Sequence, residues 1–109
     1  MRFEAYDMAL RIARELVPIL AEIRKRDADL RDQAYRAAKS MALNVAEGGR
    51  REGKDRGYHF RISAGSAQEL RMALELAEAF ALVERGRLAP VLGLIDRELA
   101  MLWRLRAPK

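Results

Sequence analysis

The chain consists of long stretches of helix-spaced apolar residues separated by short polar breaks. Residues 30–47 show this most clearly, since apolar residues three or four apart meet on one side of a helix. Two glycines, Gly48 and Gly49, follow. Glycine is the usual residue in the left-handed conformation that closes a helix. We therefore expect this helix to end at Glu47, with these residues in its buried face: Leu30, Ala34, Ala37, Met41 and Val45.

The same periodicity predicts three further helices, at residues 5–25, 55–84 and 88–105. Pro18 lies inside the first of them, where a proline removes one backbone donor and kinks the helix. Four helices with short connections are typical of an up-down-up-down antiparallel bundle. We therefore predict an all-α fold, with one four-helix-bundle domain over residues 1–109.

Three of the four predicted helices carry a second apolar band beside the first. In residues 55–84 we assign the band that contains Tyr58, Met72 and Phe80 to the core, with Glu69 at its centre. One four-helix core cannot bury both bands, and contiguous exposed apolar patches usually mark interfaces. We therefore predict a homo-oligomer; the alternative is one broad core with apolar flanks. The expected oligomer interface consists of Leu70, Leu74, Ala77, Ala81, Leu94, Met101 and Leu105.

Polar residues accompany the apolar seam between residues 30–47 and 55–84. A network of hydrogen bonds there fixes the register of two helices, and a buried carboxylate with donors nearby needs no ligand. We favour this structural interpretation over a binding pocket. The expected members of the network are Gln33, Asn44, Glu47, Ser66 and Glu69.

Charge adds one candidate site. The chain has 21 Lys and Arg against 16 Asp and Glu, a net charge of +5. Such an excess fits an anionic partner such as RNA or DNA, and equally fits charge that only maintains solubility. Phosphate contacts would be salt-dependent and independent of base sequence. The candidate nucleic-acid-binding residues are Arg50, Arg51, Lys54, Arg56 and Arg61. Alternatively, these basic residues bind no nucleic acid and only form the solvated start of the third helix.

The residues argue against an enzyme. Without cysteine there is no thiol catalysis, disulfide or thiolate metal site. Di-metal bundles need two Glu-x-x-His pairs, but His59 is the only histidine. A metal site from Glu47, Glu69 and His59, and with it a metal-dependent bundle enzyme, is the least favoured alternative. We predict no catalytic residue, no metal and no cofactor. The sequence shows neither a membrane-length apolar run nor a secretion signal, so we expect a cytoplasmic protein without membrane contact.

Four segments point to a known family. They are L-x-x-Q at residues 30–33, RAAKS at 36–40, NVAEG at 44–48 and ISAGSAQEL at 62–70. In their order and spacing the chain resembles, over nearly its whole length, the four-helix-bundle proteins encoded in intervening sequences of large-subunit ribosomal RNA genes. The same family includes the accessory protein of diversity-generating retroelements.

The resemblance implies a non-enzymatic bundle that assembles into a ring-like homopentamer. In the retroelement branch it implies a basic surface that binds nucleic acid and a partner reverse transcriptase. By position, Asn44, Glu47, Ser66 and Glu69 are motif residues with an expected structural role. Two functions stay open: a nucleic-acid-binding or accessory scaffold with a repeated basic patch, and a protein–protein interaction module whose charge is incidental.

Overall fold

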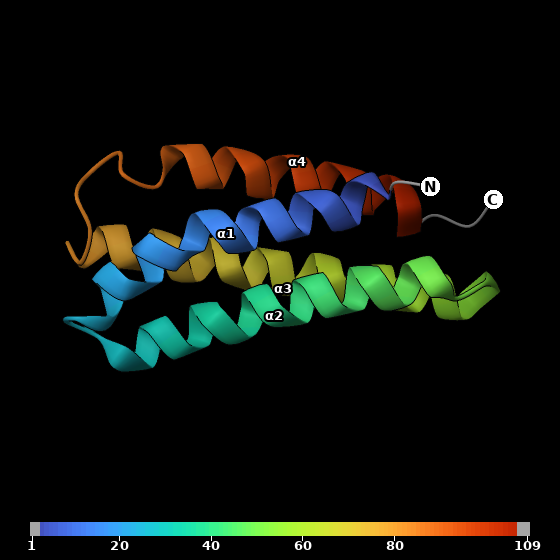
Figure 1. Cartoon of the computed structure of the whole chain (residues 1–109), viewed down its shortest axis with the longest axis horizontal. Helices are drawn as coiled ribbons and strands as arrows, with labels where there is room; N and C mark the ends of the chain where they lie inside the picture. Colours follow the sequence, from blue (N-terminus) through green and yellow to red (C-terminus); the bar gives the residue numbers. More distant parts are fainter. Residues whose placement is uncertain (1–2, 107–109) are drawn as a thin grey trace.

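The computed structural model describes residues 3–106, which form four α-helices and no strand. The helices lie side by side along the long axis of the molecule, and each runs opposite to the one before it (Figure 1). The described part of the chain measures 43 × 22 × 21 Å. The helices are α1 (Glu4–Arg24), α2 (Ala28–Arg50), α3 (Gly53–Ala79) and α4 (Ala89–Arg106).

Within the described residues, the core combines 8 alanines with 17 larger apolar side chains. Small residues on α1, α2 and α3 let the helix backbones approach closely, and the contact between α2 and α3 is the most extensive. Asp27 caps the start of α2, because its side chain accepts a hydrogen bond from the Leu30 N–H at 2.9 Å. Fully buried members of the core include Ala9, Ile12, Leu16, Ala34, Met41, Val45, Phe60, Ala67, Leu70, Leu74, Ala77, Ile95 and Leu102.

Helix α3 is rotated relative to our expectation. In α3 the band with Leu70 and Leu74 is buried, whereas Met72 and Phe80 are 60% and 62% exposed. The predicted core face of α3 therefore lies largely outside. In α1 the band containing Leu16 faces inward. The physical reason is size: the inward bands intersperse alanine and serine among the leucines, which allows close approach to the alanine-rich α2, whereas the outward bands carry larger side chains.

The predicted oligomer interface is consequently wrong for four of its residues. Leu70, Leu74, Ala77 and Leu94 lie in the core of their own chain, so no second copy can reach them. Met101 and Leu105 pack partly buried against that core, and Ala81 is exposed in the turn after α3. Apolar surface beyond the core is nevertheless present, on other faces. The exposed large apolar residues are Val17, Tyr35, Leu43, Tyr58, Met72, Leu76, Phe80 and Trp103.

Helix α2 does not stop at its glycines. It continues through Gly48 and Gly49 to Arg50. A Cβ added at Gly48 would lie 2.6 Å from the Phe60 ring, and one at Gly49 would lie 2.7 Å from the Phe3 ring. The glycines therefore allow two aromatic rings to pack on the helix backbone. The left-handed glycine is Gly53, the first residue of α3, with φ +61°.

Helix α3 ends at Ala79 rather than near residue 84. Ala81 takes the left-handed conformation with φ 58°, and the Leu82 N–H donates to the Ala77 carbonyl at 2.9 Å. This is a Schellman cap with alanine in the place that usually holds glycine. Gly86 lies in the connection to α4 with φ +84°.

Replacing Ala81 with glycine should raise the free energy of unfolding by about 1 kcal/mol, since glycine adopts the left-handed conformation without a steric cost. The matched change Ala79→Gly, inside the last turn of α3, should lower it by about as much. Urea denaturation measures both. A loss of stability in both variants would show that Ala81 is not strained.

Candidate nucleic-acid interface

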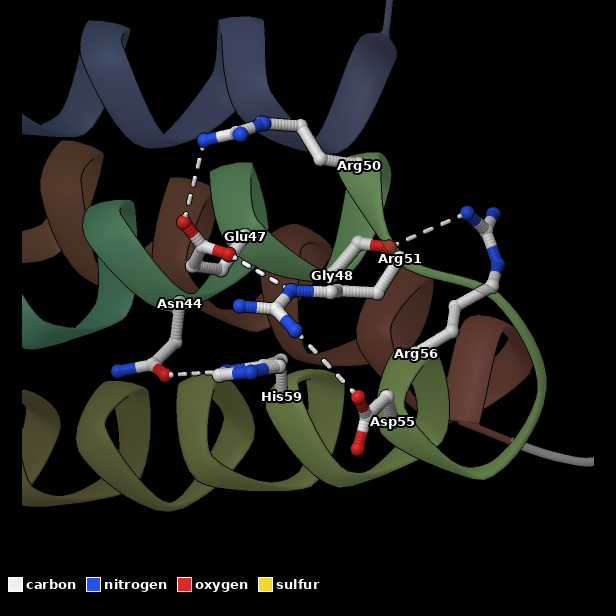
Figure 2. A network of polar contacts seen from close by, with 8 residues as sticks. All are labelled: Asn44, Glu47, Gly48, Arg50, Arg51, Asp55, Arg56 and His59. Atoms are coloured by element: carbon white, nitrogen blue, oxygen red, sulfur yellow. Dashed lines mark hydrogen bonds and ion pairs between the residues drawn. The ribbon is translucent and has the colours of Figure 1, made fainter.

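The end of the α2–α3 hairpin gathers four of the five predicted basic residues. Only Arg51 and Glu52 separate the two helices, so Arg50 and Arg51 at the end of α2 lie beside Lys54 and Arg56 in the first turn of α3. Figure 2 shows the three arginines of this set. We call these four residues the hairpin cluster. Arg61 lies apart, because it lines a groove on the α3–α4 side with Trp103.

Carboxylates hold the arginines of the hairpin cluster in place (Figure 2). Glu47 Oε2 accepts from Arg51 Nε at 3.0 Å, and Glu47 Oε1 accepts from Arg50 Nη1 at 3.3 Å. Arg51 Nη1 also donates to Asp55 Oδ2 at 3.4 Å. The hydrogen bond from Arg51 is the main cause that lowers the pKa of the Glu47 carboxyl, and Arg50 adds to it. Glu47 therefore stays ionised and keeps two guanidinium groups oriented.

Arg56 closes the end of α2. Its Nη1 donates to the Gly48 carbonyl at 3.3 Å, and its guanidinium lies 4.9 Å from the centre of the Phe60 ring. A basic side chain on a free carbonyl is a usual way to satisfy a helix C-terminus. Lys54, by contrast, is exposed and takes part in no ion pair within residues 3–106.

A seam of polar contacts continues from the hairpin cluster between α2 and α3. His59 Nδ1 donates to Asn44 Oδ1 at 3.0 Å, and Asn44 Nδ2 donates to the Ser40 carbonyl at 3.0 Å. The Ser40 and Ser66 hydroxyls lie 2.7 Å apart. Ser63 is buried and donates to the Met41 carbonyl at 2.8 Å. These bonds satisfy polar groups across the seam and set the register of the two helices.

The predicted network is only partly present. The structure joins Asn44 and Ser66 through Ser40, but Glu47 turns to the arginines instead. Gln33 donates to Asp29 on its own helix at 3.3 Å. Glu69 is exposed, so its expected place at the centre of a buried face is wrong: the rotation of α3 carries it to the surface. Gln33 and Glu69 border one open groove of about 580 Å³ between α2 and α3.

Sequence reasoning left Ser40, Ser63 and His59 out of this network. Each lies three or four residues from a motif residue, Asn44, Ser66 or Ser63, and so on the same helix side. That spacing was the available signal. Within residues 3–106 no three His, Asp or Glu side chains gather closely enough to hold a metal ion.

The sequence comparison identifies the family. Residues 1–104 match the model of the 23S rRNA-intervening sequence proteins. The chain belongs to this family. A search of curated proteins finds no match. Among solved structures the chain is similar to a protein of unknown function from the S23 ribosomal protein family of Bacteroides thetaiotaomicron. The two are 17% identical with a TM-score of 0.86, over 94% of this chain and 97% of that one, which supports the fold.

The segments that suggested the intervening-sequence family meet across the α2–α3 contact. NVAEG supplies Asn44, which bonds His59, and Gly48, on which Phe60 packs. RAAKS and ISAGSAQEL meet through Ser40 and Ser66. The geometry therefore assigns these residues to helix pairing. No described helix of this intervening-sequence protein is long and apolar enough to cross a bilayer.

The sequence analysis did not predict one buried carboxyl group of this intervening-sequence protein. Glu98 on α4 is fully buried, and both carboxyl oxygens lack a hydrogen-bond partner among the described residues. Burial disfavours the ionised form and raises the pKa of Glu98 to about 8. The sequence contains the pattern that predicts this burial, since Glu98 follows Leu94 and Ile95 and precedes Leu102 at helical spacing, on the apolar face of the helix.

Proposed function

We propose that this protein is a non-enzymatic scaffold that binds the phosphates of RNA or DNA through its hairpin cluster. We further propose that identical subunits assemble into a ring, with five subunits as the family resemblance implies. In the ring a weak basic site is repeated, and several weak sites on one rigid body bind far more tightly than one.

The observation that carries the proposal is the fixed, incompletely neutralised charge of the hairpin end. Residues 47–56 contain four Lys and Arg against three Asp and Glu, a local excess of one positive charge. Glu47 and Asp55 orient Arg50 and Arg51, so these side chains lose less freedom when they contact a phosphate. Lys54 is exposed beside them.

The start of α3 adds to the positive potential. A helix N-terminus carries a partial positive charge, and the Glu52 side chain makes no capping hydrogen bond there. Backbone N–H groups of the first turn thus lie next to Lys54 and Arg56. This combination of N–H groups and basic side chains suits phosphate oxygens without reading base sequence.

Reversing two charges of the hairpin cluster tests this function. Arg50→Glu with Lys54→Glu should weaken binding to structured RNA and flatten its dependence on salt by about one unit of slope for each phosphate that the variant no longer neutralises. Arg50 is chosen because its side chain is 78% exposed and its ion pair is the longer of the two on Glu47. Fluorescence anisotropy at several salt concentrations measures the effect.

The matched control is Arg97→Glu with Arg104→Glu, which makes the same change of charge at exposed sites on α4. This control should lower the affinity for RNA less, and most of the wild-type dependence of affinity on salt concentration should remain. Equal reductions in both variants would mean that total charge, and not the hairpin cluster, attracts RNA. Absence of wild-type binding at low salt would overturn the proposal.

A second candidate function, a protein–protein interaction module, is favoured by one observation: an apolar groove between α1 and α2. Such a surface suits a protein partner, which in a retroelement would be a reverse transcriptase. Under this alternative Arg50→Glu with Lys54→Glu leaves partner retention in a pull-down unchanged, whereas RNA binding is absent from the start.

A further inference from the structure

The groove between α1 and α2 is apolar along its floor and basic at one end. It has a volume of about 640 Å³, and none of its lining residues is acidic. Arg24 and Arg31 lie at the end nearest the α1–α2 turn, and Lys39 lies near the middle of the groove. Tyr35 lies between two of these cations, with the Arg31 guanidinium 4.6 Å and the Lys39 ammonium 5.4 Å from its ring centre. The apolar lining includes Tyr6, Leu10, Ala13, Val17, Ala42 and Leu43.

The outer side of α3 carries the opposite combination. Met72, Leu76 and Phe80 are 60%, 45% and 62% exposed and follow one another at intervals of four residues. Glu69 continues this row one turn before Met72, and Glu75 lies beside it and pairs with Arg71 at 2.8 Å; both carboxylates are exposed. We call the three apolar residues and these two carboxylates the α3 stripe. It is an apolar ridge with an acidic border.

We propose that the α3 stripe of one copy docks into the α1–α2 groove of the next copy. The proposal rests on the ring assembly in the proposed function and states which surfaces form it. A second copy is the occupant that fits, because the chain itself presents an apolar ridge whose acidic border complements the basic end of the groove. Both surfaces are large and apolar, and each lacks a partner within its own chain.

The lengths of the two surfaces agree. Tyr58, which is 53% exposed, lies on the same side of α3 as the stripe, four turns earlier. From Tyr58 to Phe80 the ridge is about 33 Å long, and the groove from Tyr6 to Arg24 is about 27 Å long, at 1.5 Å per residue. An apolar ridge and an apolar groove of similar length exclude water along most of the contact.

The charges also set the orientation. The cations of the groove lie between its middle and the α1–α2 turn, and α3 runs toward that same end of the bundle, so Glu69 and Glu75 lie in its nearer half (Figure 1). Pairing these charges places neighbouring copies side by side with parallel long axes. Because the two surfaces are different, the contact is heterologous, and a heterologous contact builds a ring when its rotation closes.

Charge exchange tests the docking. Arg31→Glu with Lys39→Glu should separate the copies, and so should Glu69→Lys with Glu75→Lys. Light scattering should then give the 12.4 kDa mass of one chain instead of the wild-type mass. All four substitutions in one chain restore the complementarity and should restore the assembly. Mixing the two double variants should raise the mass above that of one chain, since each supplies the surface that the other needs, although a ring of five cannot alternate two variants throughout and retains one repulsive contact.

The control Arg97→Glu with Arg104→Glu should keep the wild-type mass, and circular dichroism verifies helix content in every variant. The chain contains no cysteine, so cross-linking provides a second measurement that does not depend on the charge variants. Tyr35→Cys mixed with Met72→Cys should form a disulfide between the two different variants, because both positions are exposed and lie seven residues from the same end of the bundle. If disulfides joined only copies of the same variant, and none joined the two different variants, the contact would be twofold and the proposal would be overturned.

The docking would also be overturned if light scattering gave the wild-type protein the mass of one chain. The same would follow if both double variants kept the mass of the wild-type assembly. These results are separable from nucleic-acid binding. A separated variant keeps its hairpin cluster and should retain weak, salt-dependent RNA binding, whereas Arg50→Glu with Lys54→Glu should lose RNA and keep its assembly. Failure of one proposal therefore leaves the other measurable.

Discussion

Replacing Glu98 with glutamine should remove most of the pH dependence of stability between about pH 5 and pH 9. The folded-state pKa of Glu98 is raised from 4.5 to about 8 by burial. Below 4.5 the carboxyl is protonated in both states, and its contribution is fully present. Between the two values the folded state holds a proton that the unfolded state has lost, so stability falls as pH rises.

The magnitude is large for a chain of this size. Each pH unit between the two pKa values costs about 1.4 kcal/mol, so wild type should lose on the order of 4 kcal/mol by pH 9. The lowered pKa values of Glu47 and Asp96, caused first by hydrogen bonds from Arg51 and Arg71, act in the opposite direction and below this window. They therefore do not mask the effect.

The substitution Glu98→Leu distinguishes the effect of Glu98 titration on stability from the cost of burying its polar oxygens. It should remove the same pH dependence and also raise the free energy of unfolding at pH 5, because it eliminates two buried oxygens without partners. Glu15→Gln, at an exposed position of α1, is the control and should keep the wild-type slope. Urea denaturation across the pH range measures all three. A wild-type slope in Glu98→Gln would show that Glu98 does not titrate in this window.

Gly48→Ala should lower the free energy of unfolding by about 2 kcal/mol, since overpacking a filled core costs about 1–3 kcal/mol. The added methyl would lie 2.6 Å from Phe60, whose side chain is fully buried and has no room to move. Gly49→Ala should cost less, because the Phe3 ring that it meets is only partly buried.

Gly65→Ala and Gly93→Ala are matched controls inside helices. A Cβ at either position meets nothing within 4 Å, so alanine should raise stability by up to about 1 kcal/mol. Adding Phe60→Leu to Gly48→Ala should cost less than the sum of the two single changes, because a smaller side chain relieves the clash. Wild-type or greater stability in Gly48→Ala would contradict the role assigned to this glycine.

The two proposals have a joint structural consequence. If neighbouring copies dock with parallel axes, the α2–α3 hairpin ends of all subunits lie on one rim of the ring (Figure 1). The exposed Lys54 and Arg50 then recur around that rim. A single chain offers a local excess of only one charge, so repetition on one rim is what gives the site useful affinity.

The hydrophobic period by itself determined that this chain is helical, where its four helices lie to within a few residues, and that its apolar bands exceed one core. It did not determine which band faces inward. Leu70 and Met72 are equally apolar in the sequence, but only the band with Leu70 has the small neighbours that let α3 approach α2. That choice depends on the shape of the partner helix, which periodicity does not contain.

Tertiary structure also decided the roles of single residues. In the sequence Gly48 predicts the end of a helix, and only the structure shows that this glycine makes room for the Phe60 ring. The basic segment was evident from composition, but the assignment of Arg56 to a helix carbonyl and of Arg61 to another face required the fold. A sequence reports which groups are present, whereas their free energies depend on what surrounds them after folding, and that environment comes from residues distant in the chain.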